Sequence, residues 1–194
     1  MESYALPTPA YPAELAEISF ALFVNMEGSA ALRQRLIKAS TMEGDEGITE
    51  RQRVDFAFLD AKMIASRDQL LPAAHQSILA AAQGELQTQT IHSEIISNLN
   101  PTSNVAEGLR RFGISAKSTA AIVRIGPKLS ESEKRALQDE MQALAGGELG
   151  ALDDLAKNAD VAGLKKLYKL DNTTDLTPKL LASLTASNKS VGVF

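Results

Sequence analysis

The chain contains no cysteine and no tryptophan, and it has only two histidines among 194 residues. The absence of cysteine excludes disulfides, thiol catalysis and thiolate metal ligands. It fits a reducing compartment without establishing one. His75 and His92 lie on separate helical patterns, and each is more typical of a structural residue than of a functional one. We expect no metal and no cofactor.

Long apolar runs and an excess of positive charge are also missing. No stretch of about 18 apolar residues occurs, so the sequence predicts no membrane span. Residues 1–12 contain no basic residue and no apolar segment of signal-peptide length, so we expect a soluble, non-secreted protein. The 20 basic and 24 acidic residues give a net charge of -4. Any contact with nucleic acid must therefore use a local basic patch.

The length and composition predict one domain over residues 1–194. With 44% hydrophobic residues, the chain can bury a single sizeable core. Residues 1–12 are a proline-rich leader, and residues 188–194 are a short apolar tail that is either disordered or docked on a partner. Residues 42–53 are polar, contain glycine and lack an apolar period, so they predict a flexible loop.

Apolar periodicity predicts both strands and helices. Strands are expected where apolar and β-branched residues are continuous, at residues 18–24, 56–59 and 119–125. Helices are expected from residue 29, and at residues 66–83, 91–99, 104–112, 130–145, 161–170 and 178–187. This alternation predicts an α+β (mixed α/β) fold with a small, largely antiparallel central sheet packed against several helices.

Capping patterns mark several helix ends. Ser66 with Gln69, Asn104 with Glu107, and Ser130 with Glu133 each have capping-box spacing. Gly84 is expected to stop one helix and Gly113 to be a left-handed stop of another, and the helix from residue 130 is expected to end before Gly146. A proline at position 72 predicts a kink in its helix, or a helix that starts near residue 71.

No catalytic constellation is found in the sequence. His92, Ser93 and Glu94 include the residue types of a triad, but adjacent helical residues point about 100° apart and cannot converge on one proton relay. Phosphate-binding loops, dinucleotide motifs and H-E-x-x-H are missing. The sequence therefore predicts a protein that is not an enzyme.

Residues 90–125 combine the most informative features of the chain: two short helical patterns, a turn and a strand. The two helical patterns carry a Ser-Glu pair at Ser93 and Glu94 and an Asn-Val-x-x-Ala/Gly helix start at Asn104. An Asn-Leu-x-Pro turn lies at residues 98–101, and a Phe-Gly-Ile sequence lies at residues 112–114. Weaker matches lie at residues 56–60, 69–70 and 165–170. Together they resemble the family of small KEOPS (EKC) complex subunits, of the fungal type, that bind the atypical kinase PRPK.

The resemblance implies a function for the whole chain. It implies a non-catalytic KEOPS/EKC subunit that binds the PRPK-type kinase, supports its activity and reaches the other subunits through it. It also implies help in recruiting tRNA for threonylcarbamoyladenosine modification of the anticodon loop. A location in nucleus and cytoplasm and a link to telomere maintenance follow from the same resemblance.

We expect the kinase to contact the two short helical patterns at residues 91–112. These patterns cannot bury all their apolar residues unless both faces are covered, and Ile96 lies off the Ile91 and Ile95 stripe as a candidate exposed anchor. The predicted kinase-binding residues are Ile96, Asn98, Val105 and Leu109. The alternative is that these residues serve only the core.

Two groups of basic residues are candidates for contact with tRNA phosphates. The first group lies at the end of the second helical pattern and in the loop after it, and consists of Arg110, Arg111 and Lys117. The second group lies near the end of the chain and consists of Lys165, Lys166 and Lys169. The alternative for both groups is ordinary solvated charge, which at a helix C-terminus also favours the helix dipole. An alternative function is a small-molecule-binding protein or enzyme on an α/β frame, which would need a deep polar pocket with perturbed carboxylates or histidines.

Overall fold

The computed structural model describes residues 1–7, 10–102, 104–115, 119–171 and 173–187. Its centre is an antiparallel sheet in the order β1-β2-β4-β3, formed by β1 (Glu2–Ala5), β2 (Glu17–Val24), β4 (Thr119–Gly126) and β3 (Ala57–Asp60). A short strand, β5 (Glu148–Gly150), pairs with residues 22–24 of β2, beyond the part of β2 that β1 occupies. The predicted α+β fold with an antiparallel sheet is confirmed.

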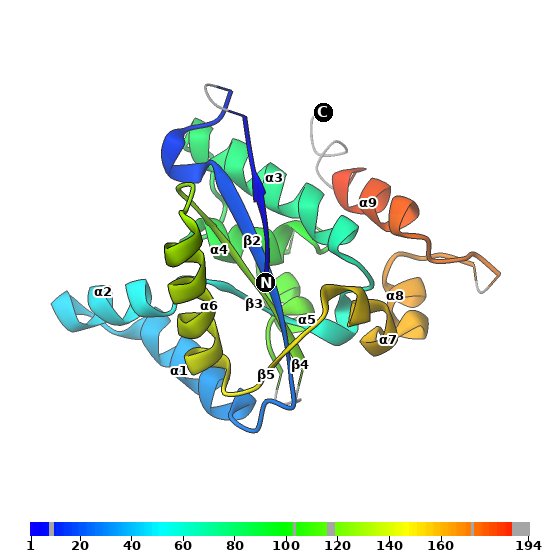
Figure 1. Ribbon diagram of the computed structural model, residues 1–194. Helices are drawn as coiled ribbons and strands as arrows, with labels where there is room; N and C mark the ends of the chain where they lie inside the picture. The colour runs from blue at the N-terminus through cyan, green and yellow to red at the C-terminus, as the bar shows by residue number, and fades with distance from the viewer. Residues whose placement is uncertain (8–9, 103, 116–118, 172, 188–194) are drawn as a thin grey trace.

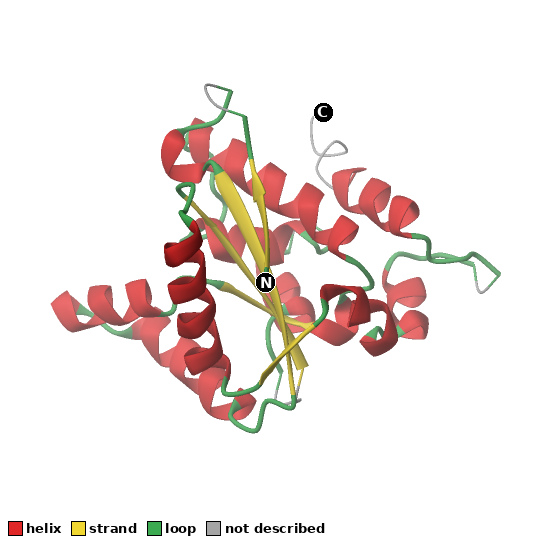
Figure 2. Ribbon diagram, viewed as in Figure 1, coloured by secondary structure: helices red, strands yellow, loops and turns green. Residues whose placement is uncertain are grey.

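Helices cover both faces of the sheet (Figures 1 and 2). Side chains alternate along β2, so Ile18, Phe20 and Leu22 belong to one buried cluster, and Ala21 and Phe23 belong to the other. The first cluster includes residues of α3 (Arg67–Gln83), α4 (Ile91–Asn98) and α5 (Val105–Phe112). The second includes residues of α1 (Ser29–Thr41) and α6 (Glu131–Ala145). Burial on both faces explains why β2 has the near-continuous apolar sequence of a fully buried strand.

The C-terminal part of the chain adds a smaller cluster beside this core. The cluster is formed by residues of α8 (Val161–Leu167) and α9 (Pro178–Ser187), whereas Leu155 of α7 (Leu155–Asn158) belongs to the first cluster. Leu164, Tyr168 and Leu181 are its buried residues. The helix predicted at 161–170 ends at Leu167, because Lys169 takes a left-handed conformation with φ 54°. Figure 1 shows α9 lying along α3. The predicted tail at residues 188–194 lies outside the described residues.

The prediction of a flexible loop at residues 42–53 is wrong, because α2 (Gly44–Arg53) occupies most of it. The guanidinium of Arg51 donates to the carbonyl oxygens of Ala39 and Met42, at 3.1 and 2.6 Å, and so binds the C-terminal end of α1. Gly47 approaches Met42 so closely that an added Cβ would overlap its carbonyl oxygen. Hydrogen bonds and close backbone packing hold α2, so it needs no apolar stripe.

The capping predictions have mixed outcomes. The box of Ser130 with Glu133 is confirmed, as are the ends of α3 and α6, each at a left-handed glycine. No box forms at Ser66, because the Gln69 side chain binds the backbone of Ala65 and Met63 instead, and α3 runs from Arg67 through the proline at 72 rather than starting near 71. Asn104 accepts from the Glu107 N–H, but the Glu107 carboxylate turns to other partners. Gly113 is extended, not left-handed, because the chain runs straight on to pair Ile114 with Phe58.

The leader at residues 1–12 contains a strand that its prolines do not reveal. β1 pairs with the first half of β2, from Glu2 opposite Phe20 to Ala5 opposite Glu17. The Tyr4 ring also packs edge-on against Phe20, with 5.6 Å between ring centroids. Long-range pairing with β2 thus gives order to a segment whose own sequence predicts little.

Candidate partner-binding surface

The pair formed by α4 and α5 carries the predicted kinase-binding residues, and a single glycine lets the two helices approach. A Cβ on Gly108 would lie 3.3 Å from the Cα of Ser97 and 3.3 Å from the Cβ of Asn100. Any larger side chain at 108 must therefore push α4 and α5 apart. A glycine inside a helical pattern was the sequence signal for this close approach.

The start of α4 is fixed by a local network of hydrogen bonds. Thr90 and Ser93 form a reciprocal capping box. The buried carboxylate of Glu94 accepts from the N–H groups of Gln87 and Thr88 and from the Thr88 hydroxyl, at 2.9 to 3.0 Å. Glu94 therefore anchors the loop that precedes α4, a structural role for the Ser-Glu pair.

His92 joins α4 to the sheet. Its Nε2 accepts from the N–H of Ile125 at 2.9 Å, and its Nδ1 lies 2.8 Å from the Asp55 carboxylate. Since Nε2 is the acceptor, Nδ1 carries the proton and donates to Asp55. β3 begins at Ala57, which pairs with Val123, so β3 does not extend to Ile125. His92 therefore supplies the hydrogen-bond acceptor that a strand partner would otherwise give the Ile125 N–H. His92 is 4% exposed, and its role is structural.

The turn between α4 and α5 is held by two asparagine side chains. The Asn98 amide donates to the Ala73 carbonyl and the Ser77 hydroxyl of α3, at 3.3 and 2.9 Å. The Asn100 amide donates to the carbonyl oxygens of Thr102 and Asn104, at 3.2 and 3.1 Å. The Asn-Leu-x-Pro turn thus fixes where α5 starts relative to α3.

The four predicted kinase-binding residues differ in exposure. Leu109 is 41% exposed and Val105 is half-buried, so both present apolar surface on α5. Ile96 is only 8% exposed and belongs to the core, and Asn98 is 1% exposed. The expectation that Ile96 is an exposed anchor is wrong, because the α4–α5 contact and the core cover both of its faces. Asn98 likewise offers no side chain to a partner in this conformation.

The predicted tRNA-binding residues lie in two separate elements. On α5, Arg111 donates to the Glu107 carboxylate from Nε and Nη2, at 2.9 and 2.6 Å, and this bond lowers the pKa of the Glu107 carboxyl. Arg110 beside it is exposed and has no ion pair within the described part of the chain. Lys166 and Lys169 are exposed and Lys165 is half-buried, whereas Lys117 lies outside the described residues. Because the helix ends at Leu167, Lys165 and Lys169 are not one helical turn apart.

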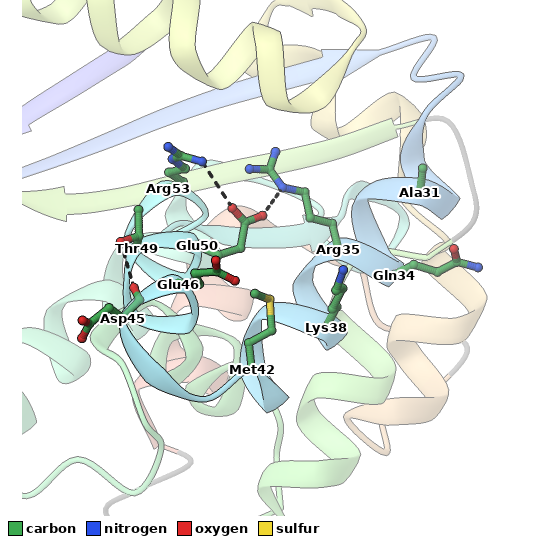
Figure 3. Close-up of a pocket in the computed structure, with 10 residues that line it drawn as sticks. All are labelled: Ala31, Gln34, Arg35, Lys38, Met42, Asp45, Glu46, Thr49, Glu50 and Arg53. Atoms are coloured by element: carbon green, nitrogen blue, oxygen red, sulfur yellow. Dashed lines mark hydrogen bonds and ion pairs between the residues drawn. The ribbon is translucent and has the colours of Figure 1, made fainter.

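A groove of about 730 Å³ lies between α1 and α2 (Figure 3). Figure 3 shows Arg35 and Arg53 both directed at the Glu50 carboxylate, with Nε of Arg35 2.5 Å from Oε1. The Arg35 guanidinium lowers the pKa of Glu50, the direction opposite to that of a general acid. Lys38, Asp45 and Glu46 also line this groove. The Glu50 carboxylate is thus paired with Arg35 and Arg53, unlike the perturbed acid or histidine that the alternative enzymatic function requires.

A metal-binding cluster and a membrane-spanning helix are both absent from the described residues. No group of three or more histidine and acidic side chains is placed to hold a metal ion. No described helix has both the length and the apolar character needed to cross a membrane.

Comparison with known proteins gives one consistent set of matches. The family model described as kinase binding protein CGI-121 matches residues 23–189. The EKC/KEOPS complex subunit CGI121 of Cryptococcus neoformans is 30% identical over 210 residues, which cover 91% of this chain and 90% of that protein. The subunit of the same name from Schizosaccharomyces pombe is 31% identical over 168 residues, covering 86% and 88%. The one from Candida albicans is 30% identical over 187 residues, covering 91% and 89%.

Proposed function

The chain belongs to the kinase binding protein CGI-121 family, and on that premise we propose that it is a non-catalytic subunit of an EKC/KEOPS complex. In this proposal it binds a PRPK-type atypical kinase directly, supports its activity and reaches the other subunits through that kinase. It further helps to recruit tRNA for threonylcarbamoyladenosine modification. It acts in nucleus and cytoplasm, and any role in telomere maintenance follows from membership of the complex.

One observation carries the kinase-binding proposal: α5 exposes Leu109 on a helix that is otherwise rigidly attached. Leu109 is 41% exposed, while Gly108 and Phe112 beside it are buried against α4 and the core. An exposed apolar side chain on a firmly held helix provides a binding anchor at a low cost in conformational entropy. Val105, one turn before Leu109, extends the same contact. Ile96 and Asn98 contribute by holding α4 in place.

Replacing Leu109 tests this proposal. Leu109→Asp removes the apolar anchor and places a carboxylate in the interface, so affinity for the PRPK-type kinase falls about 30-fold or more. Leu79→Asp is the matched control, because Leu79 on α3 has a similar exposure of 43%. The control binds within about twofold of the wild type. Equal loss in both variants, or in neither, contradicts a kinase contact at Leu109.

The proposed tRNA contact rests on Arg110, which has no carboxylate partner within the described structure and follows the apolar anchor directly. Arg110→Glu lowers tRNA affinity and reduces the slope of log affinity against log salt by about 1. Arg135→Glu makes the same charge change at an exposed position of α6, which covers the opposite face of the sheet. A slope that falls equally in both variants indicates a general charge effect and contradicts a local patch at Arg110.

A further inference from the structure

Tyr168 connects the C-terminal helices to the turn that follows α4. Its ring is 8% exposed and packs with Leu164 and Leu181 in the cluster formed by α8 and α9. Its hydroxyl donates to the carbonyl oxygen of Leu99 at 3.0 Å, across 69 residues of sequence. The segments 98–101 and 165–170, far apart in the chain, thus meet at one hydrogen bond.

The direction of this hydrogen bond is fixed by its neighbours. Oε1 of Gln69 accepts from the Ala65 N–H, so Nε2 is the donating end of that side chain, and it lies 3.3 Å from the Tyr168 hydroxyl. The phenol therefore accepts from Gln69, which leaves its proton for the Leu99 carbonyl at 3.0 Å. The Thr185 side chain of α9 is a further hydrogen-bonding neighbour of this hydroxyl. Gln69 is fully buried, so the orientation of the phenol is held from inside α3.

The acceptor is a carbonyl that α4 itself leaves without an intrahelical partner. Leu99 is the C-cap of α4, and the last carbonyl groups of a helix have no N–H ahead of them to bind. The next residue, Asn100, holds the turn through its bonds to Thr102 and Asn104. A shift at Leu99 would move Asn100, and with it the start of α5 and the exposed Leu109.

We propose that Tyr168 is a positioning residue for the partner-binding surface on α5. It holds the α4–α5 turn from the side of α8 and α9, and it acts without touching the partner, because its ring and hydroxyl are buried. The inference rests on the proposed kinase binding and adds the requirement that Tyr168, packed with α8 and α9, supports that surface. The C-terminal helices are then needed for binding even though they supply none of the apolar contact.

Removing only the hydroxyl tests this inference. Tyr168→Phe keeps the ring in its cluster and leaves the Leu99 carbonyl without this donor, so affinity for the PRPK-type kinase falls about three- to tenfold. Amide exchange at Leu99, Asn100, Thr102 and Asn104 becomes faster under conditions in which the protein is fully folded. Tyr4→Phe is the matched control: its hydroxyl donates to Glu2 at the outer strand, and its loss changes neither quantity.

Each outcome separates this inference from the proposed function. Faster exchange confined to the turn, together with weaker binding, supports a positioning role. For Tyr168→Phe, amide exchange that rises uniformly along the chain, or that stays at the wild-type rate in the turn, overturns the inference. Faster exchange in the turn without any loss of kinase affinity also overturns it. If the wild-type chain does not bind the kinase, the proposed function is overturned. If Leu109→Asp loses binding but Tyr168→Phe binds as the wild type does, only the inference about Tyr168 is overturned.

Discussion

Gly108 of α5 lies so close to Ser97 of α4 that a Cβ added to the glycine would be 3.3 Å from the Ser97 Cα. The backbones of the two helices are therefore in direct contact at the centre of the proposed kinase-binding element. This contact explains why a residue with poor helix propensity occupies the middle of α5. It also gives the surface at Leu109 a fixed position relative to the core.

Gly108→Val should separate α4 from α5. The added isopropyl group has no space between Ser97 and Asn100, so the free energy of unfolding falls by about 1–3 kcal/mol and kinase affinity falls with it. Ala106→Val is the control, because Ala106 is exposed on the same helix. Urea denaturation measures both variants. A Gly108→Val protein as stable as the control contradicts the close packing.

His92→Phe should expose a defect at the edge of the sheet. It leaves the buried N–H of Ile125 without an acceptor, which costs about 1–3 kcal/mol. Exchange of the Ile125 amide becomes faster, as measured by NMR. Asp55→Asn retains the acceptor on His92 and keeps Ile125 protected. Equal protection of Ile125 in both variants is incompatible with His92 as its partner.

Arg51→Ala should release α2 from α1. The variant loses two charge-assisted hydrogen bonds to the carbonyl oxygens of Ala39 and Met42. Amide exchange across α2 should then rise about tenfold, with α6 unchanged. Arg53→Ala serves as control, since Arg53 makes only a 3.9 Å ion pair with Glu50. A similar response in both variants shows that general charge, not the binding of carbonyls, holds α2.

The stability that Tyr168 provides should decrease at alkaline pH. Burial raises the pKa of the Tyr168 hydroxyl. Below about pH 10 both folded and unfolded chains keep this proton. Above it the unfolded chain loses the proton first, so the unfolded state is favoured and stability falls. Urea titrations at about pH 8 and about pH 11 should show a smaller difference between wild type and Tyr168→Phe at the higher pH. A constant difference argues against a buried neutral phenol.

Local sequence patterns were sufficient for elements that are stabilised locally or buried on both faces. The apolar run of β2 and the Ser130 capping box of α6 each predicted an element correctly. β1 and α2 were missed because their stability comes from distant partners. β1 is ordered by pairing with β2, and α2 by an arginine that binds carbonyl oxygens of α1.

The candidate surface was predicted in part, for the same physical reason. The helical pair agrees with the sequence pattern, and one of the four predicted contact residues, Leu109, is well exposed. Asn98 was misplaced at the surface because its partners, Ala73 and Ser77, lie on α3. No local pattern could reveal the bond between Tyr168 and Leu99, since 69 residues separate them.

The most direct test of the account is amide exchange of this chain with and without the PRPK-type kinase. The central claim is that the kinase binds the outer surface of α5. The account predicts slower exchange at residues 104–112 in the complex, with α6 on the opposite face of the sheet unchanged. Protection that falls on α6 or on the α1–α2 groove, with α5 unchanged, would contradict it.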